Sequence, residues 1–169
     1  MCLVPRAVLL LALSTAVAMS ACGGGDGTAT SPVPAGLPDD ATVSYTFRDS
    51  SVPPPFHRSY VITFDRAQAR IVVDRYGDIL ADRTAPMTPD AWTQVSEGFD
   101  GLRDIVIDEP EQGCVGGTSF ALSVAGSMTF DLSGTQCGGA ISNAAERLTE
   151  WIRPVRSLFP PMAQLAPEG

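Results

Sequence analysis

The feature that most constrains this fold is an alternation of apolar and polar residues in consecutive short segments. In residues 41–48 every second residue is apolar, and residues 59–65 and 70–76 repeat this pattern. Because successive side chains of a β-strand point to opposite faces, a period of two predicts strands with one buried face. Gly77–Asp78 makes a turn into a further short strand at residues 79–82. These short connections predict an antiparallel meander.

Two other segments have the spacing of amphipathic helices. Residues 88–101 begin with Thr88, whose hydroxyl suits an N-cap, and Pro89 suits the first helical position. Residues 141–159 form the second helix, and Pro154 inside it predicts a kink or break because proline lacks a backbone donor. One apolar stripe on each helix and alternating strands predict an α+β fold, an antiparallel sheet with two helices packed on one face.

The second half of the chain predicts further β structure between these helices. Residues 120–124 and 128–132 flank a turn and predict a hairpin, and residues 105–107 are a candidate short strand. A two-residue loop at Ala125–Gly126 would pair Val124 with Ser127.

The N-terminal segment has the pattern of an export signal. Arg6 precedes an uncharged apolar run, Ala7–Met19, which ends in small residues. A helix of that length spans roughly 20 Å, less than the roughly 30 Å of a bilayer core. We therefore interpret residues 1–21 as a signal peptide and not as a membrane span.

Met19-Ser20-Ala21-Cys22 resembles the lipobox of bacterial lipoproteins, and the Gly-rich run after it is typical of the tether in such proteins. The resemblance implies that Cys22 becomes the first mature residue, carries a diacylglyceryl thioether and is N-acylated, as by palmitate. It implies a lipid-anchored protein of the cell envelope, on the outer face of the bacterial cytoplasmic membrane or on the outer membrane. Residues 22–40 would be a flexible tether, residues 41–160 a single globular domain and residues 161–169 a loose tail.

Cysteine usage agrees with export. Cys2 lies in the signal peptide and Cys22 would carry lipid, which leaves Cys114 and Cys137. An even pair in an oxidising compartment predicts a disulfide between them. In the hairpin register above, these two cysteines also face each other at its open end.

Charge argues against nucleic acid as a partner. The chain has 19 acidic residues against 11 basic ones, all arginine, and a net charge of -8. Phosphate recognition requires clustered cations, which an acidic chain of this kind does not supply. The expected contacts are the membrane, through the lipid, and a protein or envelope ligand.

The sequence contains no motif that assigns a catalytic residue, a metal ligand or a cofactor. His57, the only histidine, follows three prolines, and with Arg58 and Tyr60 it is a candidate for a binding surface. It is otherwise a loop histidine in water or bonded to the backbone. Acidic residues between Asp104 and Glu111 indicate a solvated loop more than a calcium site.

Two classes of function remain at this point. The first is a membrane-anchored envelope lipoprotein with a non-catalytic binding or accessory domain. The alternative is a small envelope hydrolase or metal-dependent enzyme that uses His57 and a carboxylate. Under the first hypothesis His57→Ala leaves folding and the main role intact.

Overall fold

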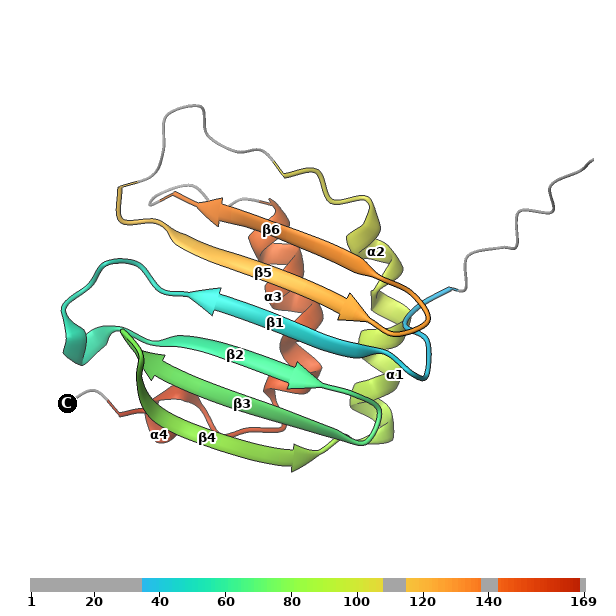
Figure 1. Ribbon diagram of the computed structural model, residues 1–169, viewed down its shortest axis with the longest axis horizontal. Coiled ribbons are helices and arrows are strands. Elements are labelled where there is room, and N and C mark those ends of the chain that lie inside the picture. The colour runs from blue at the N-terminus through green and yellow to red at the C-terminus, as the bar shows by residue number, and fades with distance from the viewer. Residues whose placement is uncertain (1–34, 108–114, 138–142, 168–169) are drawn as a thin grey trace, which may run out of the picture. The chain divides into compact units, whose positions relative to one another are not determined.

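The computed structural model describes residues 35–107, 115–137 and 143–167, and in this part of the chain one antiparallel sheet is backed by helices (Figure 1). The strand order is β4-β3-β2-β1-β5-β6. The strands are β1 (Thr42–Arg48), β2 (Ser59–Phe64), β3 (Gln68–Arg75), β4 (Asp78–Pro86), β5 (Thr118–Ala125) and β6 (Phe130–Gln136). The helices are the 3-10 turn η1 (Pro54–Phe56), α1 (Pro89–Gly98), α2 (Asp100–Arg103), α3 (Asn143–Arg156) and α4 (Met162–Leu165).

The core lies between one face of the sheet and the helices α1 and α3, which confirms the predicted α+β fold. Alternate strand residues such as Val43, Ile62 and Leu122 are buried, and their neighbours along each strand face the other way. The helices contribute buried side chains such as Val95 and Leu148. The opposite face of the sheet presents mainly serine, threonine and charged residues to solvent, as antiparallel sheets commonly do.

The helix signals in the sequence were informative about starts and less so about ends. Thr88 caps α1 as predicted, because its Oγ1 accepts a hydrogen bond of 3.2 Å from the amide of Ala91. Of the predicted kink or break at Pro154, the break is wrong, since α3 continues to Arg156. Burial of Val155 holds this last turn against the sheet, and the proline removes only one backbone donor.

Two predicted strands have different extents. Strand β4 runs from Asp78 to Pro86 and is longer than predicted, because it pairs along the whole of β3 with a bulge between Val73 and Asp74. Residues 105–107 are not a strand.

The β5–β6 hairpin has a different register from the predicted one. Val124 pairs with Phe130, not with Ser127, and Leu122 pairs with Leu132. The predicted register differs by an odd number of residues and would have placed polar residues of β6 on the core face. The loop of this hairpin is longer than predicted and is bonded to the segment before β1. The amide and hydroxyl of Ser127 donate to the carboxylate of Asp40 at 2.8 and 2.7 Å.

The folded domain extends beyond both predicted boundaries. Leu37 is already buried, although the sequence assigned it to the tether. The prediction of a loose tail is wrong as far as Pro167, because α4 forms there and Leu165 and Ala166 are buried.

Several predictions fall outside the described residues. These are the signal peptide, the lipidated Cys22 and one partner of the predicted disulfide, Cys114, so all three stay predictions. The predicted register that placed Cys137 opposite Cys114 is wrong, and the described ladder ends at the pair Thr118–Gln136, although Cys137 itself is disulfide-bonded. Within the described ranges no helix is long and apolar enough to cross a membrane.

Candidate functional site

His57 lies in a hydrogen-bond network at the end of the sheet, where the β1–β2 loop leads into β2. Its ring is 5 % exposed, with Nδ1 3.1 Å from the carbonyl oxygen of Ser50 and Nε2 2.9 Å from Oγ of Ser59. A carbonyl oxygen only accepts, so Nδ1 carries the proton and donates to Ser50, and Nε2 accepts from the Ser59 hydroxyl. This arrangement brings together a hydroxyl and a potential general base.

The nearby carboxylate of Asp49 binds backbone amides of the loop. Its two oxygens accept from the amides of Ser50 and Arg58, both at 2.8 Å, and its own amide donates to Oγ of Ser59 at 3.0 Å. The Ser59 hydroxyl therefore accepts one hydrogen bond and donates another, and the residue is 1 % exposed. A nucleophile must reach its substrate, so this hydroxyl is placed to hold the loop together.

Tyr76 covers the histidine from the β3–β4 turn. The two rings stack with centroids 3.9 Å apart and planes 22° apart. The Tyr76 hydroxyl donates to the carbonyl of Val52 at 2.5 Å, which ties this turn to the proline-rich loop. Tyr76 adopts a left-handed backbone conformation with φ 52°, which is uncommon for a residue with a side chain.

Arg58 is also buried, and it joins the loop to the C-terminal segment. Its guanidinium donates to the carbonyls of Ala166, Pro167 and His57 at 2.8, 2.6 and 2.7 Å. These carbonyls satisfy a cation that is only 8 % exposed. The segment predicted to be a loose tail is therefore one of the partners that keep Arg58 inside the fold.

These positions correct the binding-surface candidates. His57 and Arg58 are wrong as surface residues, because the network above buries both side chains. Tyr60 is half-buried and stacks on Phe47, with ring centroids 5.2 Å apart. Burial raises the pKa of the Tyr60 phenol, opposed by the nearby charge of Arg156, and burial likewise raises the pKa of Tyr45. Because His57 is interior, we now expect His57→Ala to destabilise the fold, contrary to the sequence-based expectation.

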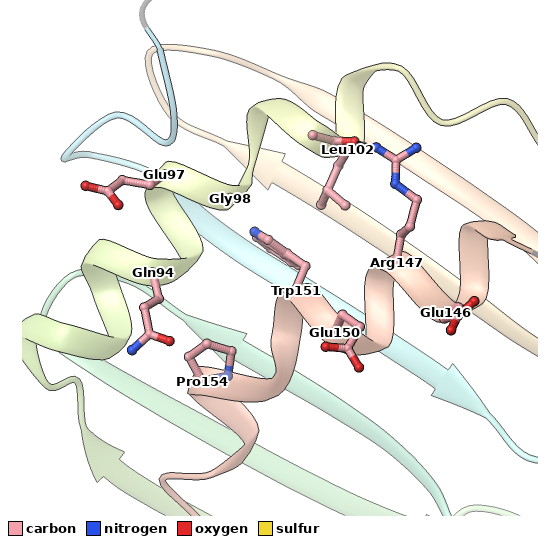
Figure 2. A pocket seen from close by; sticks show the side chains of 10 residues that line it. Gln94, Glu97, Gly98, Leu102, Glu146, Arg147, Glu150, Trp151 and Pro154 are labelled. Atoms are coloured by element: carbon pink, nitrogen blue, oxygen red, sulfur yellow. Dashed lines mark hydrogen bonds between the residues drawn. The ribbon is translucent and has the colours of Figure 1, made fainter.

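A groove lies on the outside of the helix layer. It has a volume of about 770 Å³ and lies between α1–α2 and α3 (Figure 2). Its floor is formed by Trp151, whose indole Nε1 donates to the carbonyl of Val95 at 2.8 Å, with Leu102 and Pro154 beside it. A Cβ at Gly98 would lie 3.2 Å from the indole, so this glycine lets the indole approach α1 closely.

Polar side chains border the groove on both helices. Gln94 and Glu97 lie on α1, and Glu146, Arg147 and Glu150 lie on α3 (Figure 2). Sequence reasoning missed this site, because these residues have the ordinary composition of exposed helix positions. Only the packing of two helices more than 40 residues apart in the chain brings them together.

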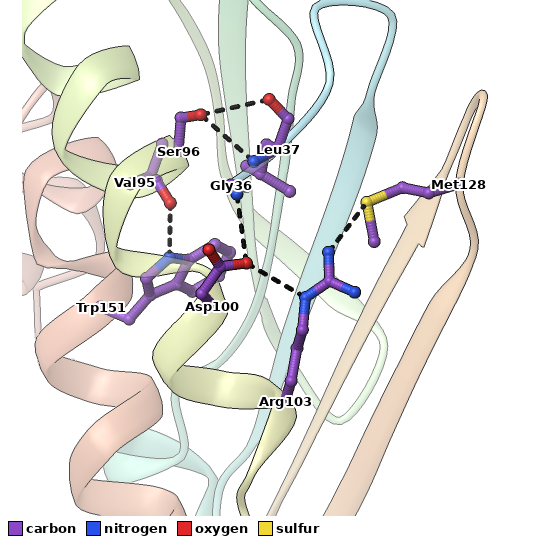
Figure 3. Close-up of polar contacts among 8 residues, drawn as sticks. All are labelled: Gly36, Leu37, Val95, Ser96, Asp100, Arg103, Met128 and Trp151. Atoms are coloured by element: carbon purple, nitrogen blue, oxygen red, sulfur yellow. Dashed lines mark hydrogen bonds and ion pairs between the residues drawn. The ribbon is translucent and has the colours of Figure 1, made fainter. Parts of the chain in front are cut away.

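The N-terminal part of the domain is fastened beside this groove (Figure 3). The amide of Gly36 donates to Oδ1 of Asp100 at 3.1 Å. The Ser96 hydroxyl accepts from the amide of Leu37 at 3.2 Å and donates to its carbonyl at 3.1 Å. Asp100 is held in turn by Arg103, 3.2 Å away. The chain therefore joins the fold at the end of α1, which also borders the groove.

Within the described ranges, no three residues among His, Cys, Asp and Glu lie close enough to hold a metal ion. Most of the acidic segment weighed as a calcium site, residues 108–111, is outside these ranges. Comparison of the chain with protein-family models, curated proteins and solved structures finds no match.

Proposed function

We propose that this chain is a bacterial envelope lipoprotein whose domain is a non-catalytic binding module, held at the membrane by lipid on Cys22. The lipobox-like sequence and the Gly-rich segment after it support the anchor. The observation that carries the binding role is the groove between α1 and α3. External hollows of this size, with an apolar floor and a few polar groups around it, are typical of binding sites.

The attachment of the chain to α1 suits a module that works close to the membrane. Between Cys22 and the contacts of Gly36 the tether has a typical reach of about 20 Å. Since Ser96 and Asp100 fix the start of the domain, the anchor would keep the groove within this range of the bilayer. The acidic domain is repelled by anionic lipid, which favours a groove that faces a partner and not the membrane surface.

The network around His57 supports a non-catalytic role. The Ser59 hydroxyl is buried and doubly hydrogen-bonded, and the Asp49 carboxylate binds loop amides. An enzyme that used His57 and a carboxylate would need those groups to face a reachable substrate.

The anchor is tested by feeding an alkyne-tagged fatty acid to bacteria that express the chain. We expect label in the wild type and in the matched control Cys2→Ser, and none in Cys22→Ser. We expect the mature N-terminus, read by mass spectrometry, to be residue 22 with an added diacylglyceryl group. An unlabelled wild type, or a mature N-terminus elsewhere, overturns the proposed anchor.

The non-catalytic role is tested with a fluorophosphonate probe, which labels activated serines. We expect no labelling of the purified mature protein. Labelling that is lost in Ser59→Ala, while a folded control such as Ser123→Ala keeps it, overturns this part of the proposal.

A further inference from the structure

We infer that the groove between α1 and α3 binds an extended, cationic segment of another protein. This inference deepens the proposed binding role and rests on it. It starts from two features of the groove, an excess of carboxylates around it and a floor that offers apolar surface.

The carboxylates come from both walls and are only partly neutralised. Glu97 and Glu146 form no ion pair with any described residue, and Glu150 pairs with Arg153 on its own helix. Arg147 is the one cation among the described residues that line the groove, and its guanidinium donates to the carbonyl of Gly101 at the α2 end. A ligand that carries positive charge complements the remaining surface.

The floor favours a protein segment over a simple cation. The indole nitrogen of Trp151 is already bonded to α1, so the small part of this residue that reaches the groove, 7 % of its surface, is carbon, and Pro154 lies beside it. The aliphatic stem of lysine or arginine lies well on such surface while its charged end reaches a carboxylate. The side-chain amide of Gln94 makes no hydrogen bond to another described residue, and it is suited to bind the backbone of an extended segment.

Two other occupants fit the charges less well. Residues 22–34 of this chain contain Asp26 and no arginine or lysine, so they lack the charge that complements the groove. A second copy would bring together two chains that each carry a net charge of -8. A separate, cationic protein segment is the partner that these charges favour.

The test measures fluorescence anisotropy of a labelled nonapeptide of lysine, leucine and serine. The lipidated protein is held in zwitterionic nanodiscs, and empty nanodiscs are the blank. We expect saturable binding that weakens with added salt, and none for the same peptide with glutamate in place of lysine. The variant Glu97→Gln/Glu146→Gln/Glu150→Gln should bind at least about tenfold more weakly. The matched control Asp39→Asn/Asp78→Asn/Asp131→Asn changes net charge equally away from the groove and should stay within about twofold of wild type.

A steric variant makes the test independent of charge. A Cβ at Gly101 would lie 3.8 Å from the Arg147 guanidinium, an ordinary contact, so Gly101→Leu fills the groove without strain in the backbone. We expect this variant to lose peptide binding and keep its thermal midpoint within a few degrees. Full affinity in both groove variants, or equal weakening in the charge control, overturns the inference. Self-association in sedimentation that Gly101→Leu abolishes also overturns it, in favour of a second copy.

The two proposals fail separately. Absence of groove-dependent peptide binding, with fatty acid still on Cys22, refutes the cationic ligand and leaves the anchor standing. Groove-dependent binding by a chain without lipid refutes only the anchor.

Discussion

Replacing His57 by alanine removes the centre of the network that closes the β1–β2 loop. The ring is 5 % exposed and holds the Ser50 carbonyl at 3.1 Å and the Ser59 hydroxyl at 2.9 Å. It also supports the ring of Tyr76, at a centroid distance of 3.9 Å. The substitution removes one hydrogen bond from the Ser50 carbonyl, which keeps its bond from the Val52 amide at 2.8 Å, and one from the Ser59 hydroxyl. It also opens a cavity beneath an aromatic ring.

These losses set the size of the effect. A buried polar group that loses its hydrogen-bond partner costs about 1–3 kcal/mol, but Ser59 keeps its bond from the Asp49 amide, which places this cost near the low end. Loss of a ring pair adds about 0.5–1.5 kcal/mol. We therefore expect His57→Ala to lower the free energy of unfolding by about 2–4 kcal/mol.

Urea unfolding of the mature protein, followed by the fluorescence of its tryptophans, measures this change. The matched control is Phe56→Ala in the same loop, where a 53 % exposed side chain should cost less than about 0.5 kcal/mol. Ser59→Ala and the double variant complete a thermodynamic cycle, and we expect a coupling energy of about 1 kcal/mol between the two side chains. A His57→Ala variant as stable as the Phe56→Ala control would refute the reasoning.

Three further outcomes concern other residues of the chain. Burial raises the pKa of Tyr45 and of Tyr60. Tyrosine in the unfolded chain ionises near pH of about 10, where the native state still keeps these two protons, so the free energy of unfolding should fall as the pH rises above that value. Native and urea-unfolded samples titrated by tyrosinate absorbance check this, and coincident curves would contradict it. Arg58→Met removes the donors to three backbone carbonyls and should lower the free energy of unfolding in urea by about 1–3 kcal/mol. It should also speed proteolysis of the C-terminal segment, and an unchanged cleavage rate would contradict this role of Arg58. Cys114 and Cys137 should appear as one cross-linked peptide in a non-reducing digest of exported protein, and alkylation of both thiols without reductant would rule out the bond.

The hairpin shows how local sequence and tertiary structure divide the information. Alternation within β5 and β6 made the strands visible, because adjacent side chains of a strand face opposite sides of the sheet. The loop between them was misjudged as two residues, although matching Leu122 with Leu132 on one face favours the longer loop. The loop also makes a contact that no local pattern shows, between Ser127 and Asp40, which are 87 positions apart in the chain.

The region around His57 shows the same division for candidate sites. The sequence showed a histidine after three prolines, a pattern compatible with an exposed loop. Burial came from the ring of Tyr76 and from the C-terminal carbonyls that bind Arg58. Those partners lie up to 109 positions away, so no local pattern predicts them.

The sequence by itself determined the α+β class, the strand positions in the first meander and the start of α1, because these depend on side-chain periodicity and on a local cap. Tertiary structure alone decided the burial of His57 and Arg58 and the groove between α1 and α3. Each of these depends on groups that are distant in the chain and meet only when the helices and loops pack against the sheet. The contacts that stabilise them are therefore not visible in any short segment of the sequence.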